Sequence, residues 1–231
     1  MDTVPDYLES EYAKELTEES YREIARLALW SKMRGPRFYL IGGWAAWRYH
    51  RGLGSKDIDI VFPGTSLLEP FLRDYYRRNG YERQPGLIES SYRKPVTVGS
   101  RTFYIEIDAA PIDKGPPFHE DGTLNLPYTL LLKHHKSWIV GGEEVLTPTV
   151  ELLLLQKVKA HRDRSWDLAH LHPEVARASY LGSKIRKDAY DIRNLAPHVR
   201  EWGTVGSIAK AHSCVPLVEQ TLKHVGIRGS L

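Results

Sequence analysis

The sequence predicts a mixed α/β domain followed by a helical domain, and two observations lead to this prediction. Between residues 37 and 110, short runs rich in β-branched and aromatic residues alternate with helical patterns and with turns that contain glycine or proline. From residue 147 to the end, the strand pattern stops and apolar residues recur at helical spacing. We therefore expect the α/β (α+β) class, with a first domain over residues 1–147 and a helical domain over residues 148–231.

In the first domain, the elements follow from hydrophobic periodicity and from the residues that interrupt it. Residues 7–33 have apolar positions at helical spacing, interrupted near Thr17, and predict one or two amphipathic helices. The other helices are expected over residues 44–50 and 66–79, and Gly80 is the expected C-cap of the latter. The expected strands are residues 37–41, 56–62, 88–98, 102–109, 137–140 and 143–146, with Gly141-Gly142 as the turn of the last pair.

The second domain begins with the strongest helical pattern of the chain. Thr147-Pro148-Thr149 precedes an apolar run that starts at Val150, and this order is typical of a helix N-terminus. The remaining residues read as helices. Breaks are expected near Pro173, Gly182, Pro197, Gly203 and Pro216.

Composition limits the classes of protein to which the chain can belong. Its 42% apolar and 26% charged residues are typical of a soluble globular protein. The single cysteine, Cys214, excludes an internal disulfide framework and a cysteine-rich zinc site, so we expect a cytoplasmic protein. No apolar run is long enough to span a bilayer, and the N-terminus has no signal-peptide core, so no membrane partner is expected. The net charge of +3 is too small to indicate nucleic-acid binding, although it suits a protein that handles polyphosphates.

Two carboxylates alternate with isoleucine in the strand expected over residues 56–62. In a strand, side chains i and i+2 share a face and lie roughly 7 Å apart, so Asp57 and Asp59 project together while Ile58 and Ile60 enter the core. Adjacent carboxylates repel one another unless a cation lies between them. Oxygen ligands of this kind suit Mg²⁺, and paired ions are the usual device for in-line phosphoryl displacement.

A third carboxylate is expected because two ions need more than two shared ligands. Glu106 and Asp108 also alternate with apolar residues, in the strand expected over residues 102–109. We predict Asp57, Asp59 and Asp108 as metal ligands and Asp108 as the general base, with Glu106 as the alternative to Asp108. A solvated strand face would explain either pair of carboxylates alone.

The diglycine Gly42-Gly43 lies between a predicted strand and a predicted helix. Without β-carbons, its backbone can approach a triphosphate, and the N–H groups that open the following helix favour anionic oxygens. An ordinary tight turn is the alternative reading. The chain contains neither GxGxxG nor GxxxxGK[ST], so a dinucleotide fold and a P-loop are not supported.

Taken in order, Gly42-Gly43, Asp57-Ile58-Asp59-Ile60 and Glu106-Ile107-Asp108 resemble the signature of the polymerase-β-like nucleotidyltransferase superfamily. The resemblance covers roughly residues 37–110. It implies a nucleotidyltransferase fold with a mixed sheet flanked by helices, two Mg²⁺ ions with Mn²⁺ as an alternative, and transfer of a nucleoside monophosphate from a nucleoside triphosphate with release of pyrophosphate.

The second half is similar to a narrower group, the abortive-infection-type (AbiEii-like) nucleotidyltransferase toxins. The motifs are Gln156-Lys157-Val158-Lys159-Ala160 and Lys187-Asp188-Ala189-Tyr190-Asp191-Ile192, with a longer spacing between them than this group has. The resemblance implies that Lys157 contacts nucleotide phosphates and that Asp188, with Asp191 less securely, supports the site. Solvated helix faces are the alternative reading for all three residues.

Several further residues flank the predicted site. Ser55 and Lys56 precede the first aspartate and are candidates for triphosphate contacts, and Arg48 and Arg51 could steer phosphates. Core and interface packing is the commoner use of tryptophans, and Trp44, next to the diglycine, is the one to test for nucleotide stacking. The histidines have irregular spacing and no nearby cysteine, which argues against zinc.

The function that these residues predict is metal-dependent transfer of a nucleoside monophosphate onto a hydroxyl. The acceptor stays open between RNA (tRNA in particular), protein and a small molecule, and the narrower resemblance implies a toxin with an antitoxin partner. Basic residues in the helical half favour RNA weakly. The alternative is a catalytically silent nucleotide- or protein-binding module of the same fold.

Overall fold

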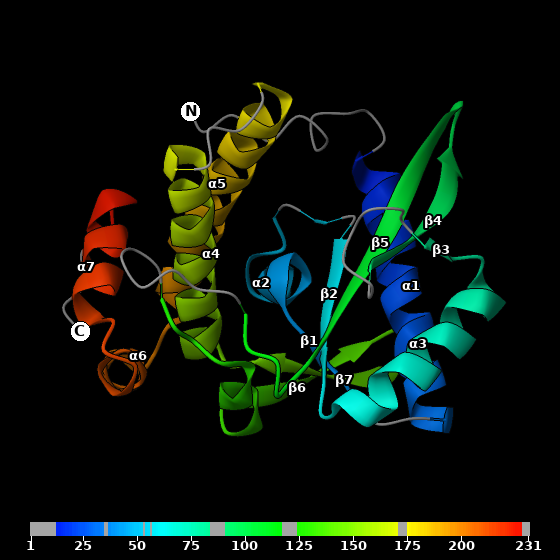
Figure 1. Cartoon of the computed structure of the whole chain (residues 1–231), viewed down its shortest axis with the longest axis horizontal. Helices are drawn as coiled ribbons and strands as arrows, with labels where there is room; N and C mark the ends of the chain where they lie inside the picture. The colour runs from blue at the N-terminus through cyan, green and yellow to red at the C-terminus, as the bar shows by residue number, and fades with distance from the viewer. Residues whose placement is uncertain are drawn as a thin grey trace. The chain divides into compact units, whose positions relative to one another are not determined.

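The computed structural model describes residues 13–34, 37–52, 54–55, 57–83, 91–116, 124–170 and 175–227 (Figure 1). The chain forms two compact units, each described by itself. The sheet unit comprises the described residues of Ser10–Gly115 and Pro127–Pro148. The helical unit comprises the described residues of Pro116–Leu126 and Thr149–Leu231.

In the described residues of the sheet unit, seven strands form one sheet in the order β3-β4-β5-β2-β1-β7-β6. The strands are β1 (Tyr39–Leu40), β2 (Asp57–Phe62), β3 (Glu82–Arg83), β4 (Ser91–Val98), β5 (Arg101–Pro111), β6 (His135–Val140) and β7 (Glu143–Pro148). Strand β2 pairs parallel with β5, and β1 pairs parallel with β7, whereas the other neighbours are antiparallel. The mixed sheet confirms the predicted α/β fold class.

The core of the sheet unit forms around the isoleucines that alternate with the acidic residues. The helices of this unit are α1 (Ala13–Arg34), α2 (Gly42–His50), α3 (Thr65–Asn79) and the short 3-10 helix η1 (Tyr128–Leu132). Ile58 and Ile107 are fully buried in one cluster with Ile24 and Leu27 of α1 and with Tyr75 of α3. Apolar burial therefore fixes which way β2 and β5 face, and the carboxylates project from the opposite side.

Glycine, proline and the apolar periodicity of the sequence predicted most helix and strand boundaries to within a few residues of those in the structure. Gly80 has a φ of +74° and caps α3, as predicted, and the positive φ values of Gly141 and Gly142 suit the turn between β6 and β7. The predicted interruption near Thr17 is wrong, because α1 continues through it. A β-carbon on Gly54 would lie 2.5 Å from Thr17 Oγ1, so the threonine side chain packs closely against this glycine. Strand β3 was not predicted.

The helical unit contains α4 (Val150–His170), α5 (Val175–Leu195), the 3-10 helix η2 (Ala196–His198), α6 (Trp202–Ala211) and α7 (Val215–His224). Helices α4 and α5 pack together. The predicted break at Gly182 is wrong, because this glycine lies within α5. Gly203 and Pro216 lie in the first turns of α6 and α7, where the missing N–H of proline costs nothing. Pro173 lies outside the described residues. None of the described helices combines the length and apolarity that crossing a bilayer requires.

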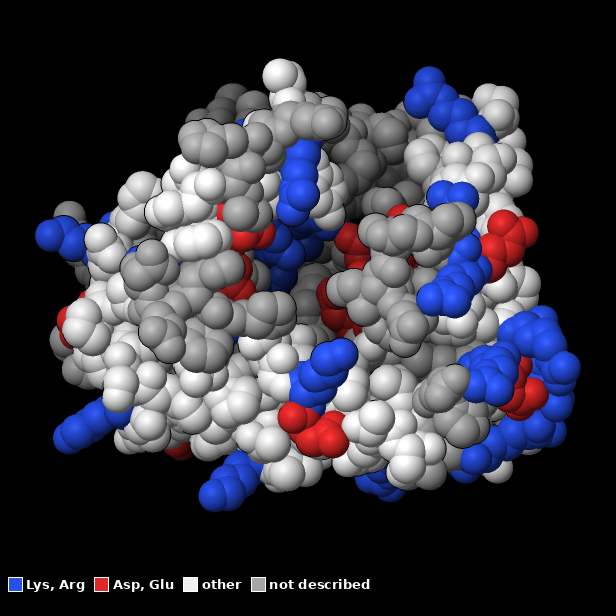
Figure 2. Space-filling model, in the orientation of Figure 1, with Lys and Arg blue, Asp and Glu red and all other residues white. Residues whose placement is uncertain are grey.

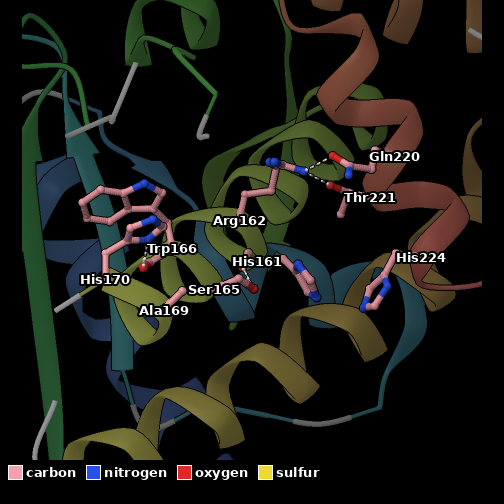
Figure 3. Close-up of a pocket in the computed structure, with 9 residues that line it drawn as sticks. All are labelled: His161, Arg162, Ser165, Trp166, Ala169, His170, Gln220, Thr221 and His224. Atoms are coloured by element: carbon pink, nitrogen blue, oxygen red, sulfur yellow. Dashed lines mark hydrogen bonds between the residues drawn. The ribbon is translucent and has the colours of Figure 1, made fainter. Parts of the chain in front are cut away.

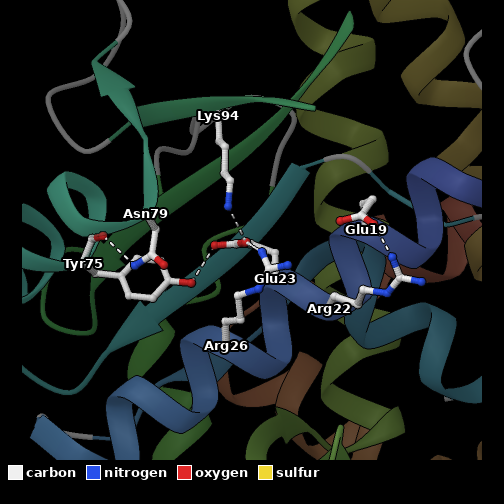
Figure 4. Close-up of polar contacts among 7 residues, drawn as sticks. All are labelled: Glu19, Arg22, Glu23, Arg26, Tyr75, Asn79 and Lys94. Carbon is white, nitrogen blue, oxygen red and sulfur yellow. Dashed lines mark hydrogen bonds and ion pairs between the residues drawn. The ribbon is translucent and has the colours of Figure 1, made fainter. Parts of the chain in front are cut away.

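A buried carboxylate connects α1 to the rest of the sheet unit (Figure 4). The Glu23 side chain is fully buried, and the Tyr75 hydroxyl donates to Oε1 at 2.6 Å. Its Oε2 lies 3.1 Å from Lys94 Nζ on β4 and 2.5 Å from Arg26 Nη1. Burial first, and the nearby Glu23 carboxylate second, raise the pKa of Tyr75 above its ordinary value, so its hydroxyl stays protonated and donates.

Candidate active site

The parallel pairing of β2 with β5 places four carboxylates side by side on one face of the sheet. Asp57 lies opposite Glu106 in the register, and Asp59 lies opposite Asp108. Asp57, Asp59 and Glu106 are partly buried, whereas Asp108 is exposed. The structure therefore brings together all four carboxylates that the sequence singled out, in two cross-strand pairs.

The diglycine opens α2 and lies against the second aspartate. Gly42 has a φ of +67°, and a β-carbon on it would lie 2.0 Å from Asp59 Oδ2. The N–H of the preceding Ile41 donates to the Asp59 carbonyl at 2.9 Å, which holds the start of α2 beside this carboxylate. Because Gly42 and Gly43 are the first residues of α2, their N–H groups belong to the end of the helix that favours anions.

Replacing Gly42 by alanine is expected to reduce both stability and activity. Alanine pays roughly 1–2 kcal/mol for the left-handed backbone, and its methyl group would push the Asp59 carboxylate out of place. Gly80→Ala is the matched control, because Gly80 also has a positive φ but has no atom within 4 Å of an added β-carbon. Thermal unfolding is measured on both variants, together with the nucleotidyl transfer that the sequence predicts. Equal effects of the two substitutions would contradict the close approach at Asp59.

Asp57, Asp59, Glu106 and Asp108 form what we call the carboxylate row. Carboxylate oxygens are the ligands that a hard cation prefers, so this donor set suits such an ion. In the part of the chain that the structure describes, no three His, Cys, Asp or Glu side chains are close enough together to hold an ion. The two-ion site with Asp57, Asp59 and Asp108 therefore stays a prediction, and the structural observation is the pairing of carboxylates across β2 and β5.

The two residues before the first aspartate differ in what can be said of them. Ser55 is 6% exposed, and its Oγ accepts the backbone N–H of Asp57 at 3.3 Å. This contact shapes the entry to β2, and the predicted triphosphate contact of Ser55 stays a prediction. Lys56 lies outside the described residues.

Sequence reasoning missed two residues on the carboxylate face, Arg93 on β4 and Tyr104 on β5. Arg93 lies opposite Glu106 in the antiparallel pairing, so its side chain leaves the same face of the sheet. Its guanidinium carbon lies 4.6 Å from the centre of the Tyr104 ring, within the range of a cation–π contact. The sequence carries no local sign of this neighbour, because the position of Arg93 depends on the register between β4 and β5.

The aromatic and basic residues of α2 have structural partners. Trp44 is fully buried in the core, so core packing explains this residue and its ring is not open to a stacked nucleobase. Arg48 donates to Thr147 Oγ1 and, at 2.8 Å, to the Ser137 carbonyl. The guanidinium of Arg51 lies 4.3 Å from the centre of the Trp47 ring. Arg48 thus ties α2 to β6 and β7, whereas Arg51, the C-cap of α2, packs on a ring of the same helix.

The lysine and aspartates of the second pair of motifs meet on neighbouring helices of the helical unit. Lys157 Nζ, on α4, lies 2.7 Å from Asp191 Oδ2 and 3.6 Å from Asp188 Oδ1, both on α5. Arg164 bonds to Asp188, and Lys187 Nζ lies 3.6 Å from Asp191 Oδ2. All of these side chains except that of Arg164 are less than a tenth exposed. The two motifs therefore form one buried ionic cluster.

The pKa values of the two lysines in this cluster are shifted in opposite directions. Burial lowers the pKa of Lys157, but the carboxylates of Asp191 and Asp188 more than offset this, and the pKa is raised from its ordinary value. Burial also lowers the pKa of Lys187, and here the neighbouring Asp191 does not compensate for it. Lys157 thus stays charged through its partners, and its predicted phosphate contact stays a prediction.

His161 on α4 is expected to make the stability of the protein fall on mild acidification. Burial lowers the pKa of His161 below its ordinary value of 6.5, with His224, Arg162 and Arg164 acting in the same direction and Asp188 opposing them. Below pH 6.5 the unfolded chain therefore binds this proton before the folded chain does, and the free energy of unfolding decreases as the pH falls.

The measurement is the free energy of unfolding between pH 7.5 and pH 5 for the natural sequence and for His161→Gln. A shallower pH slope in His161→Gln is expected. His198→Gln, at an exposed histidine of the same unit, is the control and should keep the full slope. An unchanged slope in His161→Gln would exclude this histidine as the cause.

The fold resembles that of a solved nucleotidyltransferase-like protein. An antigenic nucleotidyltransferase-like protein from Paracoccidioides brasiliensis superposes with a TM-score of 0.50 at 13% identity, covering 92% of this chain and 95% of that chain. The antibiotic-resistance factor ANT(2'')-Ia gives a TM-score of 0.49 at 13% identity, over 90% of this chain and 99% of that chain. No protein-family model and no curated protein matches the sequence. The chain therefore has the fold of a nucleotidyltransferase-like protein.

Proposed function

We propose that this protein is a metal-dependent nucleotidyltransferase that moves a nucleoside monophosphate from a nucleoside triphosphate onto a hydroxyl. The observation that carries the proposal is the cross-strand pairing of Asp57 with Glu106 and of Asp59 with Asp108. Gly42 lies close to Asp59 at the edge of this face. Such a concentration of negative charge opposes strand pairing unless cations bind there, so a structural role alone does not explain it. A metal-dependent enzyme therefore explains the four carboxylates better than a catalytically silent module does.

Within this proposal, the surroundings of the two β5 carboxylates distinguish their roles. Glu106 has the cationic Arg93 as its cross-strand neighbour, which offsets its charge. Asp108 is exposed and lies opposite Asp59, the aspartate that Gly42 approaches closely. We therefore assign the third metal ligand and the general base to Asp108, and Glu106 to an electrostatic partner of Arg93.

In the proposed reaction, the acceptor oxygen attacks the α-phosphorus of the triphosphate. The bond from the α-phosphorus to the bridging oxygen breaks, pyrophosphate leaves, and Asp108 takes the proton of the acceptor hydroxyl. Asp57, Asp59 and Asp108 would hold Mg²⁺, or Mn²⁺ in its place, which supplies the positive charge that polarises the phosphoryl oxygens. The N–H groups of Gly42 and Gly43 are suited to binding the anionic oxygens of the nucleotide.

A basic corner of the sheet unit supports RNA as the acceptor. Figure 2 shows Lys and Arg gathered at lower right, where α3 and the end of α1 lie. Arg34, Arg77 and Arg78 surround Asp74 there, at 3.6, 4.0 and 2.8 Å, and their side chains are about half exposed or more. Three cations share one carboxylate, so the corner keeps a positive charge that attracts a polyanion such as tRNA.

The toxin role is a further part of the proposal. The meeting of Lys157 with Asp188 and Asp191 in one buried cluster supports the resemblance to abortive-infection toxins, because it joins the two motifs that carry this resemblance. An antitoxin would then be a partner of the chain.

The test is transfer of label from α-labelled nucleoside triphosphates. The purified protein is incubated with Mg²⁺, each of the four triphosphates in turn, and total RNA or cell lysate, with Asp57→Asn as the control. Label in RNA or protein that is absent with Asp57→Asn would support the proposal and identify donor and acceptor class. No label from any donor, together with no triphosphate binding, would contradict the proposal and favour the silent module.

A further inference from the structure

A cavity of about 380 Å³ lies between α4 and α7 of the helical unit (Figure 3). We call it the α4–α7 pocket. Its size is at the low end of the range for small-ligand sites, roughly 300–1,000 Å³. The residues that line it are His161, Arg162, Ser165, Trp166, Ala169, His170, Gln220, Thr221 and His224.

The helical repeat explains why these residues share one cavity. His161, Ser165 and Ala169 are spaced four residues apart, as are Arg162, Trp166 and His170, so the two sets form neighbouring rows on one side of α4. Gln220, Thr221 and His224 face them from α7. None of the nine lining residues carries a negative charge, so an anion entering the pocket meets no carboxylate among them.

One wall of the pocket is a fixed aromatic stack. The rings of Trp166 and His170 lie 4.3 Å apart, with an angle of 17° between their planes. His170 Nδ1 donates to the Trp166 carbonyl at 2.9 Å, because a carbonyl oxygen can only accept, and this bond holds the imidazole in place. A flat, preorganised surface of this kind suits the face of a nucleobase.

The cation of the pocket is also held in place. Arg162 Nη1 donates to Gln220 Oε1 at 3.0 Å and to Thr221 Oγ1 at 3.2 Å, so α7 orients the guanidinium (Figure 3). Burial lowers the pKa of Arg162, but an arginine stays protonated at any physiological pH. The planar guanidinium carries five N–H donors in a geometry that matches phosphate oxygens.

We propose that the α4–α7 pocket binds a nucleoside monophosphate, with the base against the Trp166–His170 stack and the phosphate at Arg162. His224, which is exposed and has its ring centre 6.0 Å from that of His161, supplies a further polar contact at the mouth of the pocket. Because no carboxylate lines the pocket, binding requires no metal ion. This is a second nucleotide site, independent of the carboxylate row on β2 and β5.

The test is calorimetric titration of the full chain with AMP in the presence of EDTA, compared with adenosine and with inorganic phosphate. AMP should bind at least about tenfold more tightly than either of the others, because only AMP engages both the stack and the guanidinium. Asp59→Asn should bind AMP as the natural sequence does. Loss of binding in Asp59→Asn would place the nucleotide at the carboxylate row and overturn the proposal, whereas failure of nucleotidyl transfer would leave this result unchanged.

Substitutions in the pocket test the residues themselves. Arg162→Gln and Trp166→Leu should each weaken AMP binding about tenfold or more. Their matched controls are Arg200→Gln and Trp202→Leu, at residues of the same unit that do not line the pocket, and these should bind normally. His224→Ala changes an exposed side chain, so it tests the pocket without disturbing the fold, and it should weaken AMP binding. Unchanged AMP affinity in all three pocket variants, or equal affinity for AMP and adenosine, would overturn the proposal.

Discussion

Asp59→Asn is expected to lower nucleotidyl transfer on the order of 10³-fold while leaving the fold intact. Asparagine keeps the shape of the side chain beside Gly42 but removes the charge that would hold a cation between β2 and β5. Since Asp59 also faces Asp108 across the strands, losing one charge relieves repulsion, and the melting temperature should stay the same or rise. Initial rates with labelled triphosphate and a thermal melt measure the two effects.

Asp113→Asn is the matched control for this prediction. Asp113 is exposed and accepts hydrogen bonds from Thr65 Oγ1 at 2.9 and 3.0 Å, and the variant should keep full activity. Glu106→Gln and Asp108→Asn then compare the two β5 carboxylates, and the larger loss is expected for Asp108→Asn. Natural activity in Asp59→Asn would exclude the assigned metal site, and a larger loss in Glu106→Gln would exchange the two roles.

Glu23→Ala is expected to lower the free energy of unfolding by about 3 kcal/mol, because removing one member of a buried charge cluster leaves its partners uncompensated. The Tyr75 hydroxyl loses its acceptor, and Lys94, whose side chain is 22% exposed, loses its counter-charge. Denaturant unfolding gives the free energy directly. The free energy of unfolding of Glu23→Gln should lie between those of the natural sequence and of Glu23→Ala, because the amide oxygen can still accept from Tyr75.

Glu19→Ala, one turn earlier on α1, is the control for this second prediction (Figure 4). Glu19 pairs with Arg22 on the helix surface, where the two side chains are 29% and 58% exposed, so its loss should cost no more than about 1 kcal/mol. Similar costs for Glu19→Ala and Glu23→Ala would mean that the buried cluster contributes no more than a surface ion pair.

The sequence predicted the acidic side of the site because local alternation alone decides which face of a strand a residue takes. Ile58 and Ile107 must be buried, so Asp57, Asp59 and Asp108 must lie on the other face. The diglycine was likewise visible as a local break. The close approach of Gly42 to Asp59 could not be predicted from the sequence, since this contact depends on the antiparallel pairing of β1 with β2.

What the sequence could not predict depends on partners distant along the chain. Glu23 reads as one of several acidic residues on an amphipathic helix, and only its packing against Tyr75 and Lys94 makes it a buried ion. The α4–α7 pocket likewise combines a periodic set on α4 with three residues of α7. Trp44 was singled out for a stacking test because it follows the diglycine, whereas its burial is set by the core around it.

The parallel register of β2 and β5 also has a consequence for folding. The paired aspartates and their partners are about fifty residues apart along the chain, so the pairing that creates the carboxylate row closes a long loop and belongs to the slow steps of folding. Both strands are central in the sheet, with neighbours on each side, and their acidic residues repel one another as they approach. A divalent cation that screens this repulsion should therefore speed the refolding of the natural sequence more than that of Asp59→Asn. The carboxylate row is then absent from every folding intermediate that lacks the β2–β5 pair.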